Sequence, residues 1–270
     1  MSHELRSSTL AVPTTLINRA PLPHFLFLRA CLFVLFQVVI TPVFALIALL
    51  TFPLARLTRY AIITTWTRWM IGAATLFCGI RYRVIGAENI PREPCVILCK
   101  HQSAWETMAL QLIFPPQVWV MKRELLWIPF FGWGLAMLSP IAINRGSRVQ
   151  ALRQMVEQGR ERLKAGFYIV IFPEGTRIAP GHRAAYHPGG AWLTVKTGAL
   201  ALPVAHNAGE CWRKNAFIKQ PGLITVSIGR PISPTGLSAA ELNQRIEDWI
   251  EAEMPKLKTY GDSGSAQGNA

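Results

Sequence analysis

The sequence predicts an α/β protein with a mostly parallel central sheet flanked by helices, preceded by an N-terminal membrane-embedded segment of two helices. Short apolar runs of strand type alternate with segments of helical periodicity from Arg81 to Leu257, which favours a parallel sheet with helices on both sides. The membrane segment is indicated by composition. Of the 270 residues 51% are hydrophobic, and no charged residue occurs from Ala30 to Ala55.

Composition divides the chain into four parts. Residues 1–23 form a polar arm with three prolines, and residues 24–80 form a membrane-associated helical hairpin. Residues 81–257 form the main domain. The tail, residues 258–270, is rich in Gly and Ser and is expected to be disordered.

The first apolar segment is long enough to cross a hydrocarbon core of about 30 Å as a helix, with a kink expected at Pro42. A cleaved signal peptide is the alternative, but the uncharged run is too long and lacks a clear cleavage site.

The second apolar segment, Tyr60 to Ile80, carries Arg68 near its middle. A charge at the centre of a spanning helix costs about 2.5 to 3.5 kcal/mol on insertion scales. We therefore expect this segment to lie in the interface, with Trp66 and Trp69 at headgroup depth, or to double back beside the first helix.

Seven strands are predicted in the main domain, each from a short apolar run. They are Tyr82–Ile85, Cys95–Leu98, Val118–Met121, Ile141–Asn144, Phe167–Phe172, Ala201–Ala205 and Leu223–Ile228.

The helices are expected between these strands. One follows Ser103, and another lies near Ala191–Thr197. Two begin with capping-box patterns, Ser147-x-x-Gln150 and Ser238-x-x-Glu241. The stretch 124–138 is interrupted by Pro and Gly and is expected to form the wall of a surface channel.

The formal charge of +13 predicts an anionic partner. Between Glu4 and Glu88 there is no acidic residue, and arginines flank the apolar segments, so anionic lipid is favoured and nucleic acid is not expected. The five cysteines are odd in number, so a disulfide framework is not expected. No metal site is predicted: Cys95 and Cys99 lie about 13 Å apart along a strand. His182 and His187 are expected to be surface histidines.

The stretch from Cys99 to Thr107 places His101 and Glu106 at a strand-to-helix junction, the edge of an α/β sheet where ligands bind. A carboxylate that accepts one imidazole N–H fixes the tautomer of a general base. The alternative is a structural histidine. Ser103 lacks the Gly-x-Ser-x-Gly context of a nucleophile, so a helix N-cap is the favoured interpretation.

Basic residues follow three further strands. Lys122, Arg145 and Arg177 come at or just after strand ends, so they are expected at the same edge of the sheet as His101. Such cations suit a phosphate, because guanidinium and ammonium groups offset its charge and fix its orientation. The alternative for Lys122 and Arg145 is solvated loop residues. Arg177 follows the tight turn Pro173-Glu-Gly-Thr, whose amides could add to an anion-binding nest.

Four motifs together resemble those of the glycerolipid acyltransferase superfamily, in order and rough spacing. They are Lys-His101-Gln-Ser-x-x-Glu106, Ile-x-Ile-Asn-Arg145, Phe172-Pro-Glu-Gly-Thr-Arg177 and Leu202-Pro-Val-Ala205. The resemblance covers roughly residues 81 to 205. Within the superfamily, the chain most resembles the bacterial 1-acylglycerol-3-phosphate acyltransferases. One departure is that the first motif of the family normally ends in Asp, where this chain has Glu106.

The resemblance implies a role for each matched residue. His101 would be the general base and Glu106 its orienting carboxylate. The remaining residues would be substrate contacts: Lys122, Arg145 and Arg177 for the phosphate, Glu174 and Gly175 for the glycerol-phosphate pocket, and Pro203 on the acyl-donor side.

The implied reaction moves a fatty acyl group from acyl-CoA or acyl-ACP to the sn-2 hydroxyl of 1-acylglycerol 3-phosphate. It forms phosphatidic acid without a covalent acyl-enzyme and without a cofactor. The alternatives are acylation of glycerol 3-phosphate or another lyso-lipid, such as lyso-ornithine lipid, and a non-catalytic lipid-binding protein. The implied location is the bacterial inner membrane, with the catalytic domain facing the cytoplasm.

Overall fold

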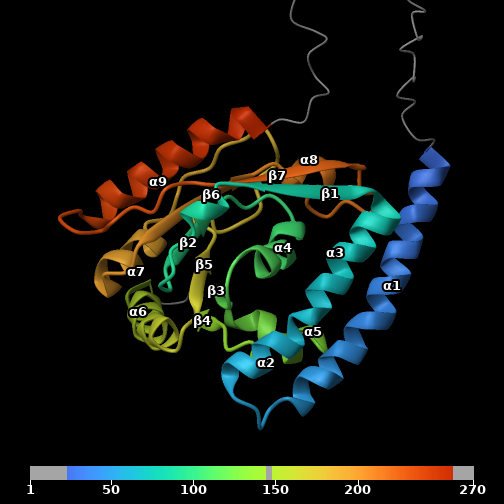
Figure 1. Cartoon of the computed structure of the whole chain (residues 1–270), viewed down its shortest axis with the longest axis horizontal. Helices are drawn as coiled ribbons and strands as arrows, with labels where there is room; N and C mark the ends of the chain where they lie inside the picture. The colour runs from blue at the N-terminus through green and yellow to red at the C-terminus, as the bar shows by residue number, and fades with distance from the viewer. Residues whose placement is uncertain (1–22, 144–147, 258–270) are drawn as a thin grey trace, which may run out of the picture.

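A computed structural model describes residues 23–143 and 148–257 (Figure 1). Its centre is a seven-stranded sheet with strand order β1-β7-β6-β2-β5-β3-β4. The strands are β1 Ile80–Ile85, β2 Val96–Cys99, β3 Gln117–Lys122, β4 Ile141–Ile143, β5 Tyr168–Ile171, β6 Ala201–His206 and β7 Gly222–Ile228. All seven predicted strands are therefore present. The last residue of the strand predicted at 141–144 lies outside the described residues.

The sheet is mostly parallel, as predicted. Five strands from β6 to β4 run in one direction, whereas β7 pairs antiparallel with β6 and parallel with β1. The carboxyl ends of β2, β3, β5 and β6 therefore meet at one edge. The reversal at β7 was not predicted, because its residues show the same apolar run as the parallel strands.

The central strands are apolar without alternation because helices cover both faces of the sheet. Every residue of β2, β5 and β6 is buried. In Figure 1 the helices α6, α7 and α9 cover one face, and α1, α3, α4 and α5 lie on the other. The long helices are α1 Pro23–Leu50, α3 Thr65–Cys78, α4 Trp105–Ile113, α6 Arg148–Lys164, α7 Gly189–Thr197 and α9 Ala239–Glu253. The short ones are α2 Arg56–Ile63, α5 Phe131–Met137, α8 Ala208–Cys211 and the 3-10 turns Ala87–Asn89, Arg123–Trp127 and Met254–Leu257.

Of the two predicted capping signals that the structure describes, the one at Ser238 is confirmed and the N-cap at Ser103 is wrong. The Ser238 hydroxyl accepts a hydrogen bond from the Glu241 amide, and Glu241 Oε2 accepts from the Ser238 amide, which completes the predicted capping box of α9. Ser147 lies outside the described residues. Ser103 Oγ accepts from the Trp105 amide at the start of α4, but the cap position itself is Ala104.

The N-terminal segment differs from the predicted pair of membrane-embedded helices. Within the part of the chain that the structure describes, one helix, α1, is long and apolar enough to cross a membrane. The second apolar segment is broken at Thr64 into α2 and α3, and α3 packs beside α1, which is the doubling back considered from the sequence. Trp66 lines a cavity and does not lie with Trp69 on the outer surface.

Helix α1 lies along the folded domain from one end to the other. In its first half, Phe33 packs edge-on against Trp212, with ring centroids 5.2 Å apart. Near its end, Ala45 and Ala48 lie close to Gly134 of α5, where a Cβ would be about 4 Å from both. One side of α1 is therefore covered by protein, while its other side exposes apolar side chains.

Candidate active site

The His101 imidazole is held by the carboxylate predicted to orient it. Between the end of β2 and the start of α4 the chain turns sharply, so that Glu106 in the first turn of α4 folds back over the loop. Glu106 Oε1 lies 2.8 Å from His101 Nδ1 and also accepts hydrogen bonds from the amides of Gln102 (2.9 Å) and Ser103 (2.7 Å). The carboxylate requires a proton on Nδ1, which leaves Nε2 free to accept one.

Burial and hydrogen bonding act on Glu106 in opposite directions. The side chain is fully buried. Burial raises the pKa of the Glu106 carboxyl, but its hydrogen bonds with His101 and the Ser103 amide act against this rise, and that pKa lies below its usual range. Glu106 is therefore ionised at neutral pH and stabilises an imidazolium at His101. The extra methylene, relative to the Asp of the family motif, does not prevent this contact.

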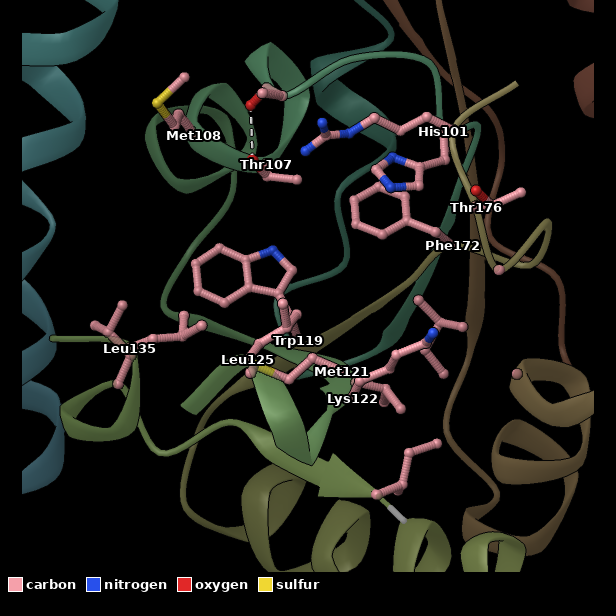
Figure 2. A pocket seen from close by; sticks show the side chains of 18 of the residues that line it. His101, Thr107, Met108, Trp119, Met121, Lys122, Leu125, Leu135, Phe172 and Thr176 are labelled. Atoms are coloured by element: carbon pink, nitrogen blue, oxygen red, sulfur yellow. Dashed lines mark hydrogen bonds between the residues drawn. The ribbon is translucent and has the colours of Figure 1, made fainter. Parts of the chain in front are cut away.

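The imidazole is also fixed by stacking. The Phe172 ring lies parallel to that of His101, with centroids 4.0 Å apart and planes at 18° (Figure 2). Phe172 directly follows β5, the neighbour of β2 in the sheet, so two adjacent strands determine the orientation of one ring.

His101 opens on a large cavity of about 1350 Å³. Figure 2 shows Trp119, Met121 and Leu125 below the imidazole, with Thr107 and Met108 of α4 beside it. Part of the cavity wall comes from the N-terminal segment, through Gln37, Thr41, Phe44, Ala45, Ile63, Trp66 and Thr67. The segment expected to form a channel wall does so, through Leu125, Phe130, Phe131, Gly134, Leu135 and Leu138. This mostly apolar cavity suits an acyl chain beside the reacting group.

Two of the three predicted phosphate contacts line the same cavity as His101. They are Lys122 at the end of β3 and Arg177 after β5. Arg145 lies outside the described residues; Ile143, two residues before it, lines the cavity. Gly175 also lines it with φ +68°, and a Cβ there would lie 3.2 Å from the His187 ring, so glycine suits both its conformation and its neighbour.

The structure places Glu174, predicted in the glycerol-phosphate pocket, and Pro203, predicted on the acyl-donor side, away from the cavity lining. Among the described residues, those that line the cavity do not include Glu174 or Pro203. The Glu174 carboxylate is buried behind His101, 2.6 Å from Lys100 Nζ. Pro203 lies inside β6, paired with Leu98 of β2, and it packs near Gly229. Motif position alone could not show on which side of the strand ends these side chains lie.

Sequence reasoning missed two residues of the site. Lys214 lines the cavity, and its Nζ donates to Thr176 Oγ1 and to the Arg177 carbonyl, both at 3.4 Å. His187 is exposed, as predicted, and it also lines the cavity beside Gly175. The charge of Lys214 was visible in the sequence, but it follows a short helix, α8, that no periodic pattern signalled.

Comparisons with known proteins agree with this geometry. The family model named Acyltransferase matches residues 81–207. A 1-acyl-sn-glycerol-3-phosphate acyltransferase of Pseudomonas aeruginosa is 48% identical over 199 residues, which are 73% of this chain and 77% of that protein. The human 1-acyl-sn-glycerol-3-phosphate acyltransferase beta is 26% identical over 209 residues, 74% of this chain and 75% of that protein.

The fold is also that of a solved structure. The crystal structure of the 1-acyl-sn-glycerophosphate acyltransferase PlsC from Thermotoga maritima matches with a TM-score of 0.73 and 23% identity, covering 86% of this chain and 97% of that chain. With the sequence matches and the paired His101 and Glu106 at the mouth of an apolar cavity, we conclude that the chain belongs to the acyltransferase family.

Proposed function

We propose that this protein is a 1-acylglycerol-3-phosphate O-acyltransferase. It transfers a fatty acyl group from acyl-CoA or acyl-ACP to the sn-2 hydroxyl of 1-acylglycerol 3-phosphate, forming phosphatidic acid. The observation that carries the proposal is the His101 imidazole, oriented by Glu106 at 2.8 Å, at a cavity that combines an apolar wall with Lys122 and Arg177. The names of the relatives at 48% and 26% identity support the same substrate.

The proposed chemistry is direct transfer. His101 Nε2 takes the proton of the acceptor hydroxyl as the oxygen attacks the thioester carbonyl. The C–S bond then breaks, and the departing sulfur takes the proton from the imidazolium, which Glu106 has stabilised. Positioning the two lipids contributes as much as proton removal, because oriented reactants react as if at very high concentration.

The phosphate of the acceptor is bound by cations at the strand ends. We assign this role to Lys122, Arg145 and Arg177, with the Gly175 turn beside them, and we add Lys214. Arg177 supplies a planar fork that can bind two phosphate oxygens at once, and the lysines add point charges. The acyl chains lie against the apolar wall.

The test is release of thiol from acyl-CoA by the purified full chain. Lysophosphatidic acid is compared with glycerol 3-phosphate and with a lyso-lipid that lacks a phosphomonoester, such as lyso-ornithine lipid. We expect the highest kcat/KM with lysophosphatidic acid. A preference for another acceptor would reassign the substrate, and absence of thiol release with every acceptor would indicate a lipid-binding protein without turnover.

We further propose that the enzyme works at the cytoplasmic face of the bacterial inner membrane. Helix α1 packs against α5, and the stretch 127–133, which runs into α5, supplies a second set of exposed apolar side chains. The α1 set is Leu35, Val38, Val39, Val43, Leu46 and Leu50, and the second set is Trp127, Ile128, Phe130, Phe131 and Trp133. So large an exposed apolar surface suits a lipid interface. Because the same segment lines the cavity from inside, an acyl chain has a short path from the bilayer to His101.

A further inference from the structure

One peptide group, which joins Lys100 to His101, is held from both sides by side chains. The Lys100 amide makes a sheet hydrogen bond to the Val204 carbonyl (3.0 Å). Beyond it, the Lys100 carbonyl accepts from His206 Nε2 (2.8 Å), and the His101 amide donates to Glu174 Oε2 (2.8 Å). His206 ends β6 and Glu174 follows β5, the two strands that flank β2. The backbone that presents the imidazole is thus clamped between side chains from neighbouring strands.

The His206 side of this clamp is a neutral imidazole. Its Nδ1 accepts from the Ala208 amide (3.2 Å), so the proton is on Nε2, which faces the Lys100 carbonyl. Burial lowers the pKa of His206, in agreement with this neutral form.

The Glu174 side is a buried carboxylate that depends on a buried cation. Lys100 is 1% exposed, and its Nζ lies 2.6 Å from Glu174 Oε1 and 2.7 Å from Glu251 Oε1 of α9. Burial raises the pKa of Glu174, and the Lys100 ammonium opposes this rise. Without that ammonium the carboxylate would have no countercharge in contact and would take up a proton at a higher pH.

Glu251 fixes the ammonium in turn. Its Oε1 accepts from the Tyr186 hydroxyl (3.0 Å), and its Oε2 lies 3.3 Å from Arg183 Nε. A continuous series of contacts therefore runs from the last helix through Glu251, Lys100 and Glu174 to the His101 amide. The acyltransferase family model ends at residue 207, well before Glu251.

We propose that Lys100, held by Glu251, is a positioning residue for acyl transfer: it keeps Glu174 in place, so that Glu174 and His206 fix the peptide that presents His101. The side chain of Lys100 does not line the cavity among the described residues, so this role is separate from substrate binding. The inference rests on the role of His101 proposed above.

The proposal predicts a particular pH dependence. The charged and titratable groups near the Glu174 carboxylate are Lys100, Glu251, Tyr186, His101 and Cys99, with Arg183 beyond Glu251. Of these groups, Lys100 is the cation in direct contact with the Glu174 carboxylate, at 2.6 Å. Lys100→Met removes the charge and keeps the apolar stem, so the pKa of Glu174 rises further and a larger fraction of the carboxyl is protonated at any given pH. A protonated Glu174 still has a carbonyl oxygen, but it is a weaker acceptor for the His101 amide than the charged carboxylate. Raising the pH deprotonates it and so strengthens this hydrogen bond again.

The experiment measures kcat and KM of full-length Lys100→Met for both substrates across pH, with thermal unfolding as a check of folding. At neutral pH we expect kcat to fall about 10- to 100-fold, as for a misplaced catalytic group, with both KM values within about twofold. The deficit should shrink as pH rises. The double variant Lys100→Met/Glu251→Gln leaves one carboxylate fewer without a countercharge. It should show the same fall in kcat that shrinks as pH rises. It therefore keeps the test decisive if the single variant does not fold.

Glu247→Gln is the matched control. Glu247 lies one turn before Glu251 on α9 and faces Arg183 at 3.7 Å, so this variant should keep the original kcat. An unchanged kcat in Lys100→Met, a deficit equal at every pH, or a change in KM alone would overturn the proposal. His101→Ala assayed in parallel separates the two ideas: if it is inactive while Lys100→Met has an unchanged kcat, only the positioning role fails.

Discussion

Glu106 Oε1 lies 2.8 Å from His101 Nδ1 and accepts two backbone amides from the loop between the two residues. The carboxylate therefore shapes the loop as well as orienting the ring. Glu106→Gln keeps the size of the side chain but removes the charge that stabilises the imidazolium. We expect kcat to fall about 10²- to 10⁴-fold with little change in KM. An unchanged kcat would mean that the carboxylate only shapes the loop.

His101→Ala should abolish acyl transfer, with a loss of at least about 10²-fold, because it removes the group that takes the proton. The ring is partly exposed at the cavity and stacks on Phe172, so folding and membrane association should persist. Thiol release and sedimentation with vesicles measure the two properties separately. Turnover similar to that of the original enzyme would exclude the proposed mechanism.

Arg177→Ala should weaken use of the phosphate-bearing acceptor. A charge-assisted contact contributes about 1.5 to 3 kcal/mol, so kcat/KM for lysophosphatidic acid should fall about 10- to 100-fold. Arg177→Lys should recover a part, since an ammonium restores charge but not the planar fork. Equal loss with an acceptor that lacks the phosphomonoester would place Arg177 in a structural or donor-side role. Lys196→Ala is the control. It removes a cation on α7 that does not line the cavity among the described residues, so kcat/KM should not change.

The ionisation of Glu106 predicts how stability depends on pH. Its folded-state pKa is lowered, so the carboxylate contributes stability that is present above the unfolded-state pKa of about 4.3 and is lost as pH falls through the folded-state value. The difference in free energy of unfolding between the original protein and Glu106→Gln should therefore shrink below about pH 4. Denaturant unfolding in detergent micelles at pH 7 and at about pH 3 measures it. A constant difference would contradict the lowered pKa.

Trp127 tests the second apolar surface. Its side chain is 73% exposed, between β3 and α5. If this segment lies in the bilayer, Trp127→Glu should lower the rate on vesicle-embedded acceptor on the order of tenfold, because an anionic side chain replaces an apolar one that faces lipid. The rate on a micellar short-chain acceptor should not change. Val149→Glu alters an apolar residue on α6 that is 63% exposed and should affect neither rate.

The sequence by itself determined the parts of this protein that depend on local pattern. Apolar runs gave all seven strands, because a strand covered on both faces needs no polar residue. Capping chemistry located the start of α9. The spacing of His101 and Glu106 across a strand-to-helix turn was enough to predict their contact, since five residues cannot separate them far.

Other features depend on contacts between segments distant in the chain, and local pattern carries no record of them. The side on which Glu174 lies was one such feature: its carboxylate turns towards Lys100 and Glu251, 77 residues further along, and not towards the cavity. The break of the second apolar segment at Thr64 and the reversed direction of β7 were others. Only the tertiary structure decided them. The direction of a strand and the partners of a buried charge depend on hydrogen bonds and ion pairs with residues that come close only when the whole chain is folded.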